Sequence, residues 1–68
     1  MDAEAFNLSI RKFLKMVGVN SQREIEHAVE RARNSGTIQG SGSFPVTVTL
    51  DIPALELSVK FDGKIELE

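Results

Sequence analysis

The fold is decided by residues 44–61, which read FPVTVTLDIPALELSVKF and carry an apolar side chain at nearly every second position. Such alternation is typical of β-strands that bury one face. Before residue 36 the rhythm is different, because apolar side chains recur every three to four positions. That spacing is typical of the buried side of a helix. The change of rhythm predicts an α+β fold in which helices precede an antiparallel sheet.

The chain has 68 residues, no cysteine and a formal net charge of −2. A domain of this length has little room for a core, and disulfides, a metal or association with another chain are its usual aids. The lack of cysteine excludes disulfides and thiolate metal sites. The acidic start of the chain and the lack of an apolar run of about 20 residues argue against a signal peptide and a membrane span. We therefore expect one soluble cytoplasmic domain, residues 1–68, with no membrane partner.

A first helix is predicted over residues 2–17, with Asp2 as its N-cap and Gly18 as the left-handed residue that ends it. At 100° per residue its apolar side chains fall within about 100° of arc and form a core face. These core residues are Phe6, Ile10, Phe13, Leu14 and Val17. On the other side lies a basic group with one apolar member, namely Leu8, Arg11, Lys12 and Lys15.

A second helix is predicted over residues 21–34. Ser21 and Glu24 have the spacing of a capping box, in which each side chain accepts from the backbone amide of the other residue. Gly36 is expected to end this helix. The short connection between the two helices makes them antiparallel or sharply crossed neighbours.

Residues 44–67 are predicted to form a sheet whose apolar side chains all lie on one face. Residues directly opposite each other in an antiparallel pair share a face. Pairing Ile52 with Leu55 and Val46 with Phe61 satisfies this condition. The loop between these two strands is then built around a type I turn, because proline cannot adopt the positive φ that a two-residue hairpin turn requires.

A third strand is expected after the Asp62–Lys64 segment, where a three-residue loop or a bulge keeps the apolar side chains on the same face. The final residues 67–68 match the remnant of a cloning site and carry no weight in this prediction. Ile38 interrupts the Gly/Ser-rich link of residues 35–43 and would add a fourth short strand at residues 37–39. The predicted architecture is therefore two N-terminal helices packed on one face of a three-stranded or four-stranded antiparallel meander.

The chain holds few groups suited to catalysis or to cofactor binding. Its lone histidine, His27, forms a Glu-x-x-His pair with Glu24, but di-iron bundles need two such pairs and two further carboxylates. No serine is placed for the histidine to activate, and no glycine pattern between a strand and a helix cradles phosphate. We predict that the protein is not an enzyme and that it has no cofactor and no metal.

The leading hypothesis is a non-enzymatic protein-interaction or self-associating module, which includes a homodimer. Its motivation is the small size of the domain and a sheet whose edges could pair with another chain. On the first helix an apolar anchor lies among cations, a pattern that suits an anionic partner surface. The candidate partner-binding residues are therefore Leu8, Arg11, Lys12 and Lys15.

The alternative is a weak nucleic-acid-binding accessory protein. Gly18 between two helices is similar to the turn of a helix-turn-helix motif. Asn20, Gln22 and Arg23 would then lie at the start of the second helix, where recognition helices contact DNA. The acidic balance of the chain disfavours nucleic acid, since such binding depends on phosphate contacts. A small-molecule site between helices and sheet ranks last, because so small a fold leaves little room for a pocket.

Residues 5–26 read AFNLSIRKFLKMVGVNSQREIE, and their most distinctive part is VGVNSQREIE, residues 17–26. Together with the order of elements that follows, this segment resembles a small bacterial family of unknown function. The resemblance extends over essentially the whole chain. It implies a stand-alone bacterial domain of this length, and it implies no activity, ligand or catalytic residue.

Overall fold

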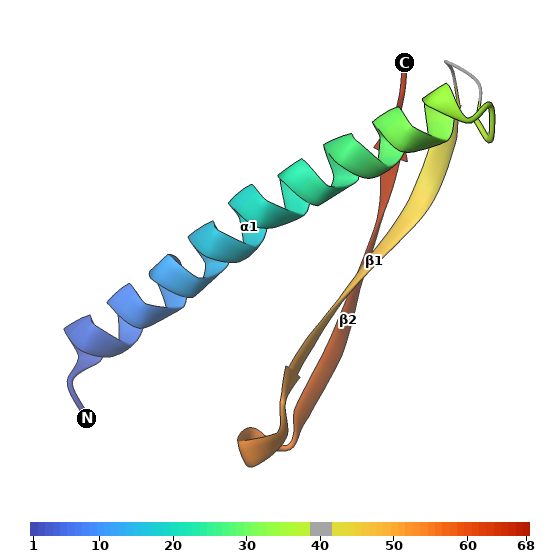
Figure 1. Ribbon diagram of the computed structural model, residues 1–68. Helices are drawn as coiled ribbons and strands as arrows, with labels where there is room; N and C mark the ends of the chain where they lie inside the picture. The colour runs from blue at the N-terminus through green and yellow to red at the C-terminus, as the bar shows by residue number, and fades with distance from the viewer. Residues whose placement is uncertain (39–41) are drawn as a thin grey trace. The chain divides into compact units, whose positions relative to one another are not determined.

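The computed structural model of the chain describes residues 1–38 and 42–68. It has one helix followed by a two-stranded antiparallel sheet (Figure 1). The elements are α1 (Ala3–Asn34), β1 (Ser43–Ile52), the 3₁₀ turn η1 (Pro53–Leu55) and β2 (Leu57–Glu66). The chain divides into two compact units, Met1–Ile38 with the helix and Gln39–Glu68 with the hairpin. The predicted α+β content is confirmed, whereas two helices on a three-stranded or four-stranded meander are wrong.

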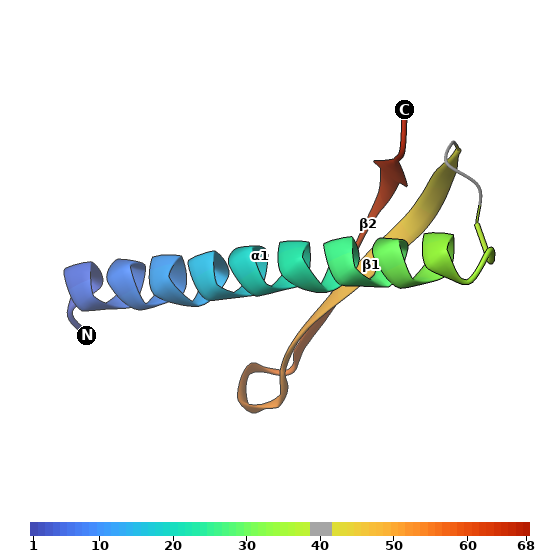
Figure 2. The same cartoon turned by 45° about the horizontal axis from the view of Figure 1, so that its top comes forward.

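The helix α1 runs without interruption through the residues at which the sequence predicts a break (Figure 2). Gly18 and Ser21 both lie inside it, so neither the predicted left-handed end nor the predicted capping box forms. A break would leave up to four amides and four carbonyls without helical partners at the two new ends. A glycine inside a helix costs only about 1 kcal/mol relative to alanine, so continuing the helix is favoured.

The apolar side chains of α1 also favour one continuous helix. The two stripes predicted for separate helices have centres that differ by only about 65° at 100° per residue, so they share one side. Ser21 falls between Val17 and Ile25, one turn from each. The Asn20 side chain donates from Nδ2 to the Met16 carbonyl oxygen at 2.8 Å, which holds this polar residue within the helix. Because the apolar residues of both predicted helices lie on the same side, one continuous helix keeps them together.

The two ends of α1 form where the sequence predicts them. Asp2 is the N-cap, and its Oδ1 accepts from two amides of the first turn at 2.9 and 3.2 Å. At the other end Gly36 adopts a φ of +75°, and its amide donates to the Arg33 carbonyl at 3.2 Å. The Thr37 amide donates to the Ala32 carbonyl at 2.9 Å. This pair of bonds is a Schellman motif, in which glycine supplies the left-handed conformation.

The strands β1 and β2 pair over ten residues each. Ile52 lies opposite Leu57, and Phe44 lies opposite Ile65. The prediction that the apolar side chains share one face is confirmed. The predicted register is wrong by two residues, because it placed Ile52 opposite Leu55. The difference arises at the loop, where η1 occupies three residues and a left-handed fourth residue precedes β2.

The predicted turn at Asp62 and Gly63 does not form, because both residues lie within β2. Asp62 lies opposite Thr47, whose hydroxyl donates to the Asp62 carboxylate at 2.8 Å. Gly63 lies opposite Val46, and a Cβ on this glycine would be 3.5 Å from the nearest valine methyl group. Continuing the strand keeps the apolar side chains on one face, which a two-residue turn here would not do. The predicted third strand is therefore the second half of β2.

The predicted fourth strand at residues 37–39 is not found in its described part. Thr37 and Ile38 form a bend after α1. The rest of that prediction, and the centre of the Gly/Ser link, fall on residues 39–41, which lie outside the described residues. The hairpin does gain one bond beyond its last paired residues, because the Leu67 amide donates to the Gly42 carbonyl at 2.9 Å.

The hairpin loop contains one residue in a conformation that side chains disfavour. Glu56 is left-handed, with φ 52° and ψ 37°, and its amide donates to the Pro53 carbonyl at 3.0 Å. Only glycine adopts this region without steric cost. We expect Glu56→Gly to raise the free energy of unfolding by about 0.5 kcal/mol in urea titrations, the strain relief exceeding the entropic cost of glycine. Glu56→Ala is the control, because it keeps the Cβ and should give no gain. A Glu56→Gly variant less stable than Glu56→Ala would contradict this account.

Candidate functional site

The helix α1 has one long apolar side, here called the α1 stripe. Its members recur every three or four residues over the length of the helix. They are Phe6, Ile10, Phe13, Leu14, Val17, Ser21, Ile25, Ala28, Val29 and Ala32. Phe6 is 50% exposed and Phe13 is 48% exposed. A single helix has no second layer of its own to enclose such side chains, so the α1 stripe is suited to contact with another element.

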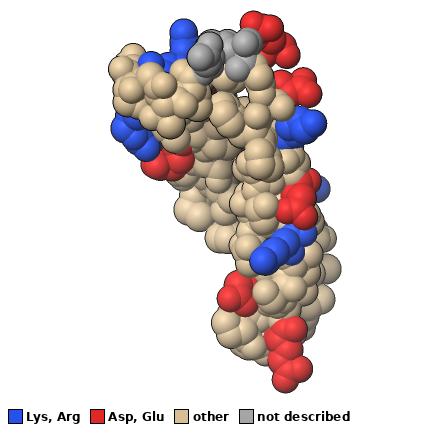
Figure 3. Space-filling view, turned by 90° about the vertical axis from the view of Figure 1, so that its right-hand side faces the viewer, with Lys and Arg blue, Asp and Glu red and all other residues tan. Residues whose placement is uncertain are grey.

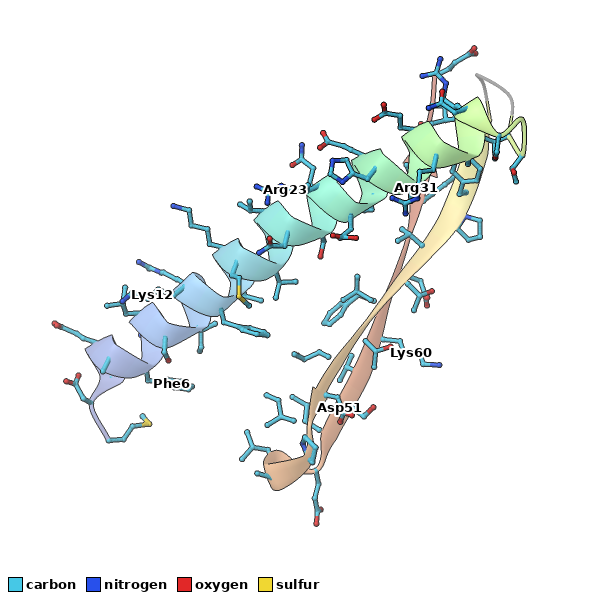
Figure 4. The ribbon with its side chains drawn as sticks, in the orientation of Figure 1. Phe6, Lys12, Arg23, Arg31, Asp51 and Lys60 are labelled. Atoms are coloured by element: carbon cyan, nitrogen blue, oxygen red, sulfur yellow. The ribbon has the colours of Figure 1, made fainter. Side chains whose placement is uncertain are left out.

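The hairpin also has one apolar side, here called the hairpin face. Its members alternate along both strands and lie opposite one another in the observed register. They are Phe44, Val46, Val48, Leu50, Ile52, Leu57, Val59, Phe61 and Ile65. Phe61 is 57% exposed. Asp51 and Lys60 project from the opposite, polar side of the hairpin (Figure 4). Two strands form a single layer, and a hairpin of this kind is marginally stable unless something covers its apolar side.

None of the described residues, 1–38 and 42–68, is buried. Contiguous exposed apolar side chains on this scale are uncommon on monomeric proteins and mark surfaces for interaction. The sequence predicts that these side chains form a core between helices and sheet, and it does not mark them as a site. The sequence does contain a sign of this surface. The apolar residues of the two predicted helices fall on the same side when residues 3–34 are read as one helix, so the apolar side continues across the predicted break.

The predicted partner-binding residues form one group on α1, here called the basic face. At 100° per residue Leu8, Arg11, Lys12 and Lys15 fall within about 100° of arc. Leu8 is 52% exposed. Phe6 and Lys12 project from different sides of the helix (Figure 4), so the basic face is separate from the α1 stripe. The helix therefore presents two different surfaces, of which the apolar one is much longer.

The residues considered for nucleic-acid binding do not form one surface. Asn20, Gln22 and Arg23 spread over about 160° of arc in the middle of α1. The Gln22 side chain donates from Nε2 to the Glu26 carboxylate at 3.3 Å, and the Asn20 amide is bonded to its own helix. The turn of a helix-turn-helix motif is lacking, since α1 is unbroken there. On the side shown in Figure 3, basic and acidic side chains are interspersed and the basic ones form no continuous patch.

Few other features of the described residues suggest a ligand. No group of three or more His, Cys, Asp or Glu side chains in residues 1–38 and 42–68 is placed to hold a metal ion. An open hollow of about 310 Å³ is lined by Gly42, Ser43, Glu66 and Glu68, so its polar side chains are a hydroxyl and two carboxylates. No helix in the described part of the chain has both the length and the apolar character needed to cross a bilayer.

Comparison with curated proteins and with solved structures finds no match. Comparison with protein families finds one whose model covers residues 1–68, and its description is a family of unknown function, DUF6494. The match agrees with the resemblance inferred from residues 5–26. The chain belongs to this family of unknown function, DUF6494, over its full length of residues 1–68.

Proposed function

We propose that this protein is a non-enzymatic interaction module that associates with a second copy of itself through its apolar surfaces. The observation that supports the proposal is the pair of long apolar sides, one on a single helix and one on a single hairpin. Each element is one layer thick and cannot enclose its own apolar side chains. Removing such side chains from water contributes about 25 cal/mol per Å² and is the usual driving force of association.

The chemistry of the chain supports a binding role over catalysis. In residues 1–38 and 42–68 the carboxylates and the single histidine lie on the surface and are not enclosed among apolar side chains. Small domains commonly gain stability by associating when disulfides are not available. A self-associating module needs no cofactor, and we propose none.

The basic face supports a second candidate role, binding an anionic surface on another protein. The observation that favours it is the gathering of Leu8 with three cations on one arc of α1. Exposed cations contribute less than buried apolar area, since solvent and salt screen them. We therefore place the basic face second, as a surface that remains accessible when the α1 stripe is covered.

Light scattering over a concentration series tests the proposal, with the wild-type chain expected to have the mass of a dimer. Phe13→Glu, on the α1 stripe, should weaken the free energy of dimerisation by about 2 kcal/mol per chain. Because a dimer contains two copies of the substitution, Kd should rise roughly 1,000-fold. Leu8→Glu, on the basic face, is the matched control because Leu8 and Phe13 have similar exposure on one helix. Its mass should stay that of a dimer. Circular dichroism should show whether each variant keeps its helix.

Two outcomes would count against this proposal. A wild-type chain that stays monomeric at every concentration would rule out self-association. A dimer that is lost in Leu8→Glu and kept in Phe13→Glu would move the contact to the basic face.

A further inference from the structure

We propose that two copies of the hairpin join edge to edge, with β2 beside β2 in antiparallel orientation, about a two-fold axis at Gly63. This inference rests on the proposed self-association and adds the edge at which the two chains meet. The axis is perpendicular to the sheet, so both copies of the hairpin face lie on the same side of a four-stranded sheet. Three or more strands with an apolar face are stable where a lone hairpin is marginal.

The backbone groups of β2 that point outwards can be identified from the hydrogen bonds of the hairpin. In residues 1–38 and 42–68 the sheet has two strands, so both of them are edges. The Leu67 amide donates to the Gly42 carbonyl, which makes these two residues a hydrogen-bonded pair of the ladder. Such pairs alternate along an antiparallel ladder with pairs whose N–H and C=O groups point away from the partner strand. The outward-pointing residues of β2 are therefore Ser58, Lys60, Asp62, Lys64 and Glu66.

The outer edge of β1 is less suited to a further strand. By the same alternation Pro45 is one of its outward-pointing residues. Proline has no N–H group, so a strand added at this edge would lack one hydrogen bond, and proline on an edge strand is a usual protection against pairing. The strand β2 contains no proline. The edge of the hairpin that is open to a further strand is therefore that of β2.

The charges along the outer edge of β2 alternate in sign and lie on the polar side of the hairpin. They are Lys60, Asp62, Lys64 and Glu66. An alternating series of four charges has the opposite signs when it is read in the opposite direction. In the antiparallel pair centred at residue 63, Lys60 lies opposite Glu66, and Asp62 lies opposite Lys64. Each contact occurs twice in the dimer, and opposite charges directly across an antiparallel pair are stabilising.

The apolar side chains match in the same register. The residues opposite each other are Phe61 and Ile65, Val59 and Leu67, and Gly63 and its own copy at the axis. All residues from 59 to 67 are therefore matched, polar with polar and apolar with apolar. Leu57 and Ser58, the first two residues of β2, lie outside this matched segment.

Neighbouring registers match fewer charges. A shift that exchanges the two sides of the strand would place polar side chains opposite apolar ones. A pair centred at residue 62 places Lys60 opposite Lys64, and a pair centred at residue 64 places Asp62 opposite Glu66. A pair centred at residue 61 matches Lys60 with Asp62 alone. The pair centred at residue 63 is the one that gives all four charges an opposite partner.

Single engineered cysteines test this register, since the chain has no cysteine of its own. Gly63 would lie opposite its own copy in a pair without hydrogen bonds, where the Cα atoms are about 4.5 Å apart and a disulfide can form. A Cβ at this position would be 3.5 Å from a Val46 methyl group, an ordinary contact. Mild oxidation of Gly63→Cys should therefore yield a disulfide-linked dimer, seen by mass under non-reducing conditions. Phe61→Cys is the control on the same side of β2, and it should stay unlinked because its two copies are about 13 Å apart along the strands.

Exchange of charges is a second test, and it leaves the α1 stripe and the hairpin face unchanged. Lys60→Glu would place glutamates opposite each other twice in the dimer, and Glu66→Lys would do the same with lysines, so each should raise Kd about 30-fold. The double variant Lys60→Glu/Glu66→Lys restores opposite charges and should associate as the wild-type chain does. Within one chain these residues lie opposite Thr49 and Ser43, which carry no charge, so recovery in the double variant reports the contact between chains.

Three results would overturn the edge pairing. Linkage of Phe61→Cys in place of Gly63→Cys would move the axis to residue 61. A wild-type dimer in which neither cysteine variant links would exclude β2 as the shared edge. A double charge variant weaker than both single variants would exclude the charge contacts. These results would leave self-association standing, whereas a monomeric wild-type chain would end both proposals.

Discussion

Replacing Val19 with proline should cost about 3 kcal/mol of stability, because the residue lies inside α1. Proline has no amide hydrogen to donate to the carbonyl four residues earlier, and its ring collides with that carbonyl. A domain of fewer than about 70 residues has only about 3–5 kcal/mol in total. We therefore expect Val19→Pro to lose most of its cooperative unfolding transition, as followed by far-ultraviolet circular dichroism in urea.

Val19→Ala is the matched control for this variant. Val19 is 50% exposed and lies off the α1 stripe, so removing two methyl groups there should change stability little. Alanine also has a higher helix propensity than valine, which offsets part of any lost contact. If α1 were two helices joined near Gly18, position 19 would lie in the connection and proline would be tolerated. Equal stability of Val19→Pro and Val19→Ala would therefore refute a continuous helix.

Replacing Leu50 with aspartate should cost about 3 kcal/mol, because it places a charge in the middle of the hairpin face. Leu50 is half-buried and lies opposite Val59. The loss of apolar burial alone is worth about 1.5–3 kcal/mol, and desolvation of a carboxylate adds to it. We expect the midpoint of urea unfolding to fall sharply and, where the hairpin face contributes to association, the dimer to weaken.

The neighbouring position supplies the control. Thr49 is on the polar side of the same strand, opposite Lys60. Thr49→Asp introduces the same carboxylate but sets it across from a cation, and such cross-strand pairs contribute about 0.2–1 kcal/mol. This gain offsets the lower strand propensity of aspartate, so stability should change by less than about 0.5 kcal/mol. If Thr49→Asp were as destabilising as Leu50→Asp, the assignment of the two sides of the hairpin would fail.

The sequence predicted local structure correctly wherever a single residue type meets a specific backbone requirement, such as a helix cap or a positive φ. Asp2 was predicted as an N-cap and accepts from the first-turn amides. Gly36 was predicted to end a helix and does so with a positive φ. Alternation predicted the face of each strand residue, because successive side chains of a strand must point to opposite sides. These predictions depend on short-range geometry, which neighbouring residues determine.

The candidate site was predicted only in part. The basic face around Leu8 was found as a group, since it depends on helical spacing alone. The residues Asn20, Gln22 and Arg23 were grouped by assuming a helix start at Ser21, and they spread apart once that start is removed. The α1 stripe and the hairpin face were missed as sites because helical spacing and strand alternation of apolar side chains predict a core.

By itself the sequence determined where α1 begins and ends, which strand residues share a face, and that the fold mixes helix with antiparallel sheet. Only the tertiary structure decided that residues 18–24 continue a helix, that Asp62 and Gly63 continue a strand, and that the register pairs Ile52 with Leu57. The physical reason is the same in each case. At a glycine, a serine or an Asp-Gly pair, the local free energies of turning and of continuing the element differ by only about 1 kcal/mol. Whether the turn forms depends on hydrogen bonds and apolar contacts that the uninterrupted element gains along its whole length.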